Sequence, residues 1–142
     1  LSANSGYKPT ASDLTSSEVN AIAIPNPKSA PYGKAAMEFL DYLGVSDSIR
    51  HKLVFGESVS QVNQFVITGA AQVGFTARSV VHSPTLKERA SWAEIDDSMY
   101  TPISQGVVTI DNSNREKAML FLEFLFSPEG KKVLQKYGYK TD

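Results

Sequence analysis

Residues 22–37, IAIPNPKSAPYGKAAM, join an apolar run to a helical pattern through a proline-rich loop. The short apolar run at the start predicts a buried strand over Asn20–Ile24, which Pro25 is expected to stop. Pro31 suits the first turn of a helix, and the apolar spacing after it predicts a helix over Pro31–Leu43. A strand, a loop and a helix in this order begin an α/β fold.

The loop before this helix is the first candidate site. The first N–H groups of a helix lack intrahelical acceptors, and the helix dipole makes this end positive. With Pro31 heading the turn, the backbone N–H groups of Tyr32 and Gly33 are expected to be available to an anion. The alternative is an ordinary strand–loop–helix corner whose N–H groups meet only water.

The same pattern recurs further along the chain. After a short turn expected at Asp47–His51, a second apolar run predicts a strand over Leu53–Phe55, and Ser58 with Gln61 has the spacing of a capping box at the start of a helix. A third run, Gln72–Phe75, predicts another strand. Alternating strands and helices at this spacing predict right-handed βαβ units and a parallel sheet, with helices on both faces.

Three loops follow the carboxyl ends of these strands, where open α/β sheets bind ligands. They are Pro25–Gly33, Gly56–Val59 and Thr76–Ser79. The second loop offers the first-turn N–H groups of Val59 and Ser60, so two helix N-termini could face one small oxyanion. The alternative is that Ser58 satisfies its own helix and leaves nothing for a ligand.

The remaining segments are less regular. Residues 1–19 predict a loop or extended arm with a turn at Ser12–Asp13. Beyond Ala77 the predicted elements are a helix or turn at Arg78–Leu86, short strands at Ser91–Ile95, Tyr100–Ile103 and Gln105–Ile110, a helix from the capping box Ser113–Glu116 to Phe126, and a last helix that Ser127 caps.

Composition excludes several classes of function. The net charge of −1 argues against a nucleic-acid partner, because there is no basic excess to neutralise phosphates. The absence of cysteine excludes disulfides, thiol nucleophiles and Cys-ligated metals. The chain begins at Leu1 with a polar, irregular segment, and we expect it to be a processed product that begins partway through a larger protein.

Residues with catalytic potential are few. His51 and His82 lie in polar turns and have no metal-ligand spacing, so both are expected to be surface or structural residues. Asp96 and Asp97, with Glu94 nearby, could hold a hard cation, although a solvated acidic loop is the favoured interpretation.

Four segments in order carry a resemblance: IAIPNPKSAPYGKAA, KLVFGESVSQVNQFVITGAAQVGFTA, YTPISQGVVTI and FLEFLFSPEGKKVLQKYGY. From about Ala21 to Tyr139 the chain resembles the periplasmic molybdate-binding proteins of ABC transporters. The resemblance implies a type II periplasmic-binding-protein fold, with two α/β lobes and a cleft that holds molybdate or tungstate. It also implies partners in the membrane subunits of an importer, a periplasmic or membrane-tethered extracytoplasmic location, no cofactor and no enzymatic activity.

The resemblance assigns donors residue by residue. It places ligand N–H groups at Tyr32, which follows Pro31, and at Val59, which follows Ser58. Some members add a tyrosine hydroxyl where this chain has Ala77, so that contact is expected to be absent or supplied elsewhere.

The resemblance also divides the chain. Residues 1–19 would be an arm after the strand that enters the second lobe, 20–104 the second lobe, and 105–142 a return strand and helices of the first lobe. Full members are longer, so we expect a fragment that lacks most of the first lobe, with apolar helix faces that favour self-association. Two alternatives stay open: another small anion (sulfate, phosphate or an organic acid), and a metal-dependent hydrolase that uses Asp96 and Asp97.

Overall fold

The computed structural model describes residues 1–3, 8–83, 86, 90–111 and 114–141. The chain divides into two compact units, Leu1–Ile103 and Ser104–Asp142. The assignment of these units to two lobes of a binding protein stays a prediction.

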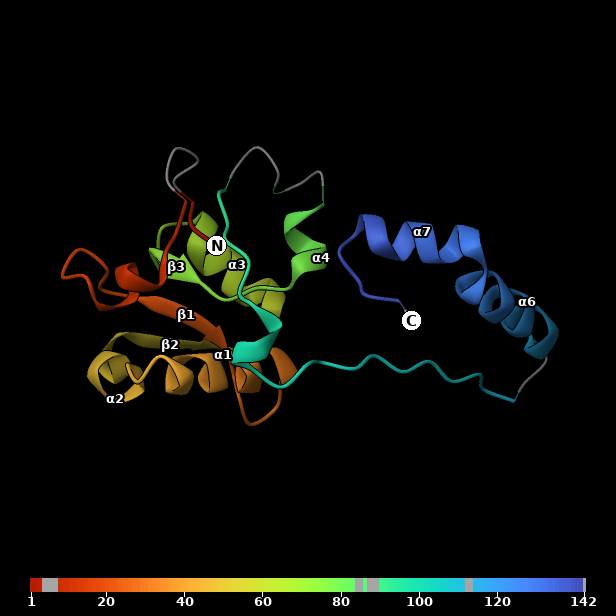
Figure 1. Ribbon diagram of the computed structural model, residues 1–142, viewed down its shortest axis with the longest axis horizontal. Coiled ribbons are helices and arrows are strands. Elements are labelled where there is room, and N and C mark those ends of the chain that lie inside the picture. The colour runs from red at the N-terminus through yellow and green to blue at the C-terminus, as the bar shows by residue number, and fades with distance from the viewer. Residues whose placement is uncertain (4–7, 84–85, 87–89, 112–113, 142) are drawn as a thin grey trace. The chain divides into compact units, whose positions relative to one another are not determined.

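The first unit is built on a parallel three-stranded sheet with the order β2-β1-β3 (Figure 1). This arrangement confirms the α/β prediction. The strands are β1 (Ile22–Pro25), β2 (Leu53–Gly56) and β3 (Val73–Gly74). The helices of the unit are α1 (Pro31–Tyr42), α2 (Ser46–Ile49), α3 (Val59–Ile67) and α4 (Arg78–Val81), with 3-10 turns η1 (Ala11–Thr15), η2 (Arg50–Lys52) and η3 (Asp97–Met99).

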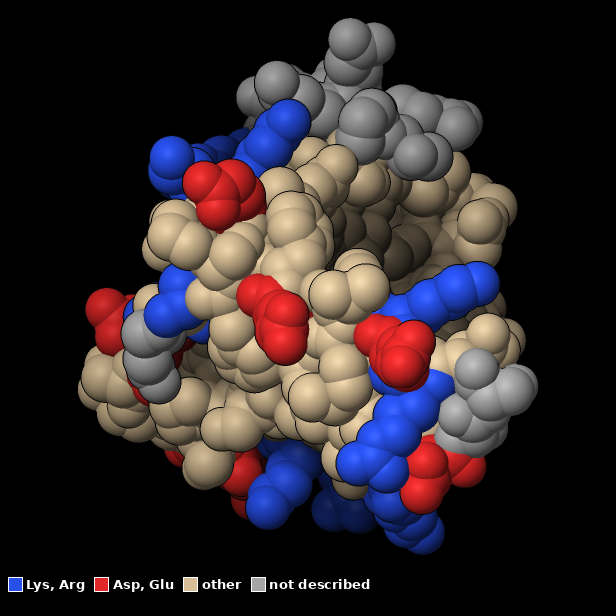
Figure 2. Space-filling view, turned by 90° about the vertical axis from the view of Figure 1, so that its right-hand side faces the viewer, with Lys and Arg blue, Asp and Glu red and all other residues tan. Residues whose placement is uncertain are grey.

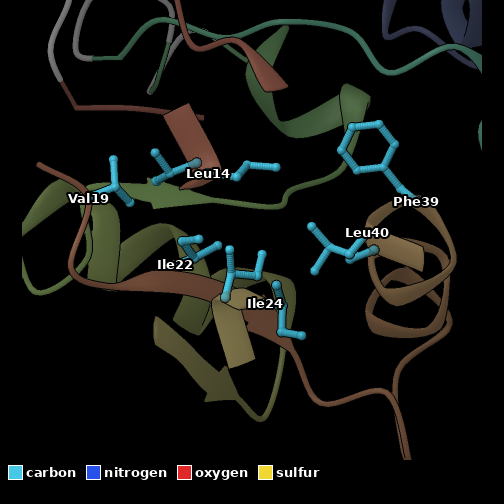
Figure 3. Close-up of a cluster of buried hydrophobic side chains, with 9 residues drawn as sticks. Leu14, Val19, Ile22, Ile24, Phe39 and Leu40 are labelled. Atoms are coloured by element: carbon cyan, nitrogen blue, oxygen red, sulfur yellow. The ribbon is translucent and has the colours of Figure 1, made fainter. Parts of the chain in front are cut away.

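Side chains of the central strand alternate between two cores, which makes the unit three-layered. Ile22 and Ile24 pack in one core with Phe39 and Leu40 of α1 (Figure 3). Ala23 points to the other face and packs with Val62 and Val66 of α3. Successive residues of a strand face opposite sides, so a short, fully buried strand requires apolar residues throughout.

The structure corrects three details of the first unit. Pro25 does not stop β1: it is the last paired residue, in register with Gly56 of β2. The turn expected around Asp47–His51 is helical and forms α2 and η2. Residues 1–19 are more than an extended arm, because η1 places Leu14 in the core, where Val19 joins it (Figure 3).

The N-terminal residues extend the sheet on the β3 side. Leu1 and Gly74 exchange two backbone hydrogen bonds of 2.9 Å, which is the pattern of an antiparallel pair. Ser2 and Ser91 form an antiparallel bridge in the same way. Leu1 is therefore buried, and burial lowers the pKa of its ammonium group from 8.0 to about 6.

The described part of the second unit forms the helices α6 (Arg115–Phe126) and α7 (Pro128–Lys136). The expected cap of α7 is confirmed, because Ser127 Oγ accepts a hydrogen bond from Gly130 N–H at 3.2 Å. The predicted cap of α6, Ser113, lies outside the described residues. Val133, an apolar residue of α7, is half exposed.

The strand predicted over Gln105–Ile110 does not form. Its alternating apolar residues fit a strand, but no strand in the described part of the chain pairs with them, and Val108 is 86% exposed. Several large apolar side chains of α6 are also exposed: Met119, Leu120, Phe121, Phe124 and Phe126. Across the described ranges, no helix has the length and apolar content required to cross a lipid bilayer.

Candidate functional site

The carboxyl ends of the three strands meet at one level of the sheet. Pro25 is paired with Gly56 across β1 and β2. Ala23 is paired with Gly74, and Phe75 N–H still bonds to Ala23 O at 2.9 Å, so Thr76 reaches the level of Pro25. The three predicted loops therefore leave the sheet side by side, as open α/β sheets require for a ligand site.

The loop after β1 is shaped by its own hydrogen bonds. Asn26 O accepts from Ala30 N–H at 2.8 Å, and Asn26 Oδ1 accepts from Lys28 N–H at 3.1 Å. Asn26 N–H in turn donates to Gly56 O at 2.8 Å, which ties this loop to the end of β2. The start of α1 is thus held in place by backbone and Asx-turn contacts.

The first turn of α1 agrees only in part with the prediction. Pro31 is at the first helical position, as expected, and Tyr32 follows it with its backbone N–H at the positive end of the helix. Gly33 was expected to offer a second N–H, and this is wrong: it donates to Ala30 O at 2.9 Å. The 3-10-type bond tightens the turn and removes Gly33 as a backbone donor.

Gly33 instead has a packing role. A Cβ at this position would lie 2.0 Å from Pro25 O and 2.8 Å from Pro27 N. Only glycine lets α1 approach the end of β1 this closely. Gly33 therefore positions Tyr32 next to the carboxyl edge of the sheet.

The first turn of α3 keeps its predicted donors. Ser58 Oγ accepts from Gln61 N–H at 3.2 Å, and Gln61 Oε1 accepts from Glu57 N–H at 2.6 Å. These contacts cap the helix but use neither Val59 N–H nor Ser60 N–H, and no acceptor among the described residues bonds to either. The alternative in which Ser58 leaves nothing for a ligand is therefore not supported by the geometry.

The loop after β3 supplies no polar side chain at the predicted position. Ala77 is buried and precedes α4, and its methyl group cannot replace a hydroxyl donor. Arg78 follows it and forms an ion pair with Glu94 at 2.7 Å. Sequence reasoning missed this pair, because its members lie on separate segments and no local spacing relates them.

The carboxylates of the proposed hydrolase site are used locally. Asp96 Oδ1 accepts from Ser98 N–H at 2.9 Å and caps η3, and Asp97 Oδ1 accepts from the Tyr100 hydroxyl at 2.9 Å. In the described ranges, no cluster of three His, Cys, Asp or Glu residues could hold a metal ion. His82 stacks edge-on against Trp92 at 5.2 Å, as a structural histidine does.

Acidic and basic residues nearly balance in this chain, with 15 Asp and Glu against 14 Lys and Arg. On the face shown in Figure 2, acidic and basic side chains lie interspersed among uncharged ones. This mixture is consistent with the net charge of −1. A small anion would therefore depend on oriented N–H groups and helix dipoles rather than on a large basic patch.

Comparisons with known proteins place the chain among solute-binding proteins. The sequence profile of a family described as bacterial extracellular solute-binding proteins matches residues 4–140. The chain is 40% identical over 126 residues to the molybdate-binding protein of Rhodobacter capsulatus, covering 88% of this chain and 49% of that protein. It is 36% identical over 119 residues to the molybdate-binding protein of Azotobacter vinelandii, covering 83% of this chain and 47% of that protein.

A solved structure gives the same relationship in three dimensions. The periplasmic molybdate-binding protein of Azotobacter vinelandii superposes with a TM-score of 0.79 at 29% identity, covering 91% of this chain and 57% of that chain. The likeness supports a lobe of the type II periplasmic-binding-protein fold. The chain spans about half the length of the curated relatives that it matches.

Proposed function

The chain belongs to the bacterial extracellular solute-binding proteins, and on that premise we propose that it binds molybdate or tungstate for an ABC importer. The family is one of binding proteins, so the chain is a binding module rather than an enzyme. Two of the relatives are named for molybdate binding, which favours this ligand over sulfate, phosphate or an organic acid. Such a protein would act in the periplasm or tethered outside the cytoplasmic membrane, with the importer's membrane subunits as partners.

The observation that carries the proposal is the pair of helix N-termini at one edge of the sheet. Val59 N–H and Ser60 N–H of α3 are available to an acceptor, and Tyr32 begins α1 beside the same edge. Neutral backbone donors bind a fully ionised tetrahedral anion without a counter-charge, and they discriminate by size and geometry. Two neighbouring residues act through position: the Ser58 side chain caps α3, and Gly33, which lacks a side chain, lets α1 pack closely against the end of β1.

In the proposed mechanism these donors form one wall of a cleft. The opposite wall would come from the other lobe, which a protein as long as the relatives would contain. Molybdate would bind donors on both walls, and these contacts would favour the closed state of the cleft. Ala77 adds no hydroxyl to this wall, so the proposal relies on Tyr32 and Val59.

A substitution can remove one proposed donor while leaving the helix intact. Val59 is the first residue of α3, where proline is well tolerated, and Ser58 before it has the extended backbone (φ −151, ψ 164) that proline requires of its neighbour. V59P therefore deletes the N–H group, and V59A is the matched control that shortens the side chain but keeps the N–H.

Isothermal titration with molybdate, and with sulfate for comparison, measures the effect. A hydrogen bond to a charged group contributes about 1.5–3 kcal/mol, so V59P should weaken molybdate binding by roughly 10- to 100-fold. V59A should bind like the parent chain. Equal affinities for V59A and V59P would show that Val59 N–H is not a ligand, and equal affinities for sulfate and molybdate would reject the molybdate assignment.

A further inference from the structure

An ion pair lies directly beside the proposed site. Arg78 is the first residue of α4 and immediately follows Ala77 at the carboxyl end of β3. Its Nη1 lies 2.7 Å from Glu94 Oε1, and the two side chains are 43% and 49% exposed. A cation at this edge of the sheet is therefore held by a carboxylate while both groups still reach solvent.

The Tyr100 phenol connects this ion pair to the start of α1. Burial raises the pKa of the Tyr100 hydroxyl, and the carboxylate of Glu94 raises it further, whereas the guanidinium of Arg78 acts in the opposite direction. Asp96 and Tyr32 also raise it. Arg78 and Glu94 therefore act electrostatically on the same phenol as Tyr32, a residue of the first turn of α1.

The segment that carries Glu94 is anchored to α1. Glu38 Oε2 accepts from Thr101 N–H at 2.7 Å, and the Tyr100 hydroxyl donates to Asp97 Oδ1 at 2.9 Å. These contacts lie at η3 and directly after it, and Ile95, which precedes η3 and is next to Glu94, packs against the core. Glu94 is therefore presented to Arg78 from an ordered part of the unit.

We propose that Arg78 is a further anion contact of the binding site and that Glu94 restrains it. The inference rests on the proposed function, because it concerns the same edge of the sheet. Exposed ion pairs are weak, so the guanidinium can exchange Glu94 for a bound oxyanion at small cost. The coulombic attraction of the Arg78 guanidinium for a dianion is twice that for a monoanion at the same distance. A doubly charged ligand therefore competes better with Glu94 for the guanidinium.

The test removes the restraint and compares two tetrahedral anions of different charge. Sodium molybdate supplies the dianion and sodium perrhenate the monoanion, and isothermal titration measures both against the 142-residue chain and its E94Q variant. A unit charge about 10 Å from a dianion in a water-like medium changes its affinity by roughly fourfold. E94Q should therefore bind molybdate roughly three- to tenfold more tightly, and the logarithm of the gain for perrhenate should be about half as large.

Two further variants separate Arg78 from a general effect of charge. R78Q/E94Q keeps the parent net charge but removes the guanidinium, so its molybdate affinity should fall below the parent value, whereas a general effect of charge would leave the two equal. E18Q removes an exposed carboxylate that forms no ion pair in the described part of the chain, and it should leave the affinity unchanged.

The outcomes distinguish this inference from the proposed function. Binding by the parent chain without a gain in E94Q would overturn the role of Arg78 and leave the molybdate proposal standing. An affinity of R78Q/E94Q equal to or above that of the parent would also overturn it, because the guanidinium would then not contact the anion. Binding by E94Q alone would support the role of Arg78, and no binding by any variant would overturn both proposals for this chain.

Discussion

Gly33→Ala is the substitution for which the structure predicts most clearly whether the free energy of unfolding rises or falls. In a helix, replacing glycine by alanine normally stabilises the fold by about 0.5–1 kcal/mol. Here the new Cβ would lie 2.0 Å from Pro25 O, whereas ordinary contact begins at 3.4 Å. The start of α1 would have to move by about 1.4 Å against a loop held by backbone hydrogen bonds.

Overpacking of this kind costs about 1–3 kcal/mol, which exceeds the gain in helix propensity. G33A should therefore lower the free energy of unfolding, and it should weaken molybdate binding because Tyr32 moves with the turn. G106A, in the second unit, controls for the exchange itself because a Cβ at Gly106 would meet nothing within 4 Å, and far-UV circular dichroism follows its unfolding. G106A should stay within about 0.5 kcal/mol of the parent.

Urea unfolding followed by tryptophan fluorescence measures this effect in the first unit alone. The chain has one tryptophan, Trp92, which packs against the α3 side of that unit's core. A G33A chain as stable as the parent, or more stable, would refute the close approach of α1 to Pro25.

Three further predictions concern other contacts. S58A should cost about 1 kcal/mol in the same urea assay by removing the cap of α3, whereas S58N should retain most of the stability, and equal losses for both would argue against the cap. Between pH 6 and 8 the unfolded chain holds the Leu1 proton more tightly than the folded chain, so the free energy of unfolding should rise by about 2 kcal/mol over this window; N-terminal acetylation should abolish the rise, and a rise that survives acetylation would point to another group. G130A would place a Cβ 2.1 Å from Phe124 O, so it should destabilise the packing of α6 and α7 by about 1–3 kcal/mol, seen by far-UV circular dichroism, and a G130A chain as stable as the parent would contradict this close contact.

Local patterns were sufficient to predict the elements that carry the site. The spacing of apolar residues predicted β1, α1, β2, α3 and β3, because buried strands and amphipathic helices each impose their own period. The caps at Ser58 and Ser127 were predictable for the same reason, since a cap depends on residues three positions apart.

Contacts between distant segments could not be predicted in this way. Leu1 pairs with Gly74, and Arg78 pairs with Glu94, through tertiary proximity that no local spacing encodes. The strand expected over Gln105–Ile110 was predicted but does not form. Alternating apolar residues indicate that a segment could present one apolar face as a strand, but they do not show that another strand is available to pair with it.

The donors themselves were predicted with partial success. Val59 N–H is available as expected, because the cap of α3 uses side chains and a later N–H. Gly33 N–H is not, because α1 begins with a tighter turn than the regular helix that the sequence pattern suggests. Whether the first turn of a helix is tight or regular depends on how the preceding loop packs. Here the close contact of Gly33 with Pro25 determines the geometry of that turn.

The most direct test of the account is an amide-resolved NMR titration of the ¹⁵N-labelled chain with molybdate, beside an identical titration with sulfate. We expect the amide signals of Tyr32, Val59 and Ser60 to shift with molybdate and to saturate together. Sulfate should produce smaller chemical-shift changes in these signals at the same concentration. Molybdate shifts that leave these three amides unmoved, or sulfate shifts that saturate them equally, would contradict the site proposed for this chain.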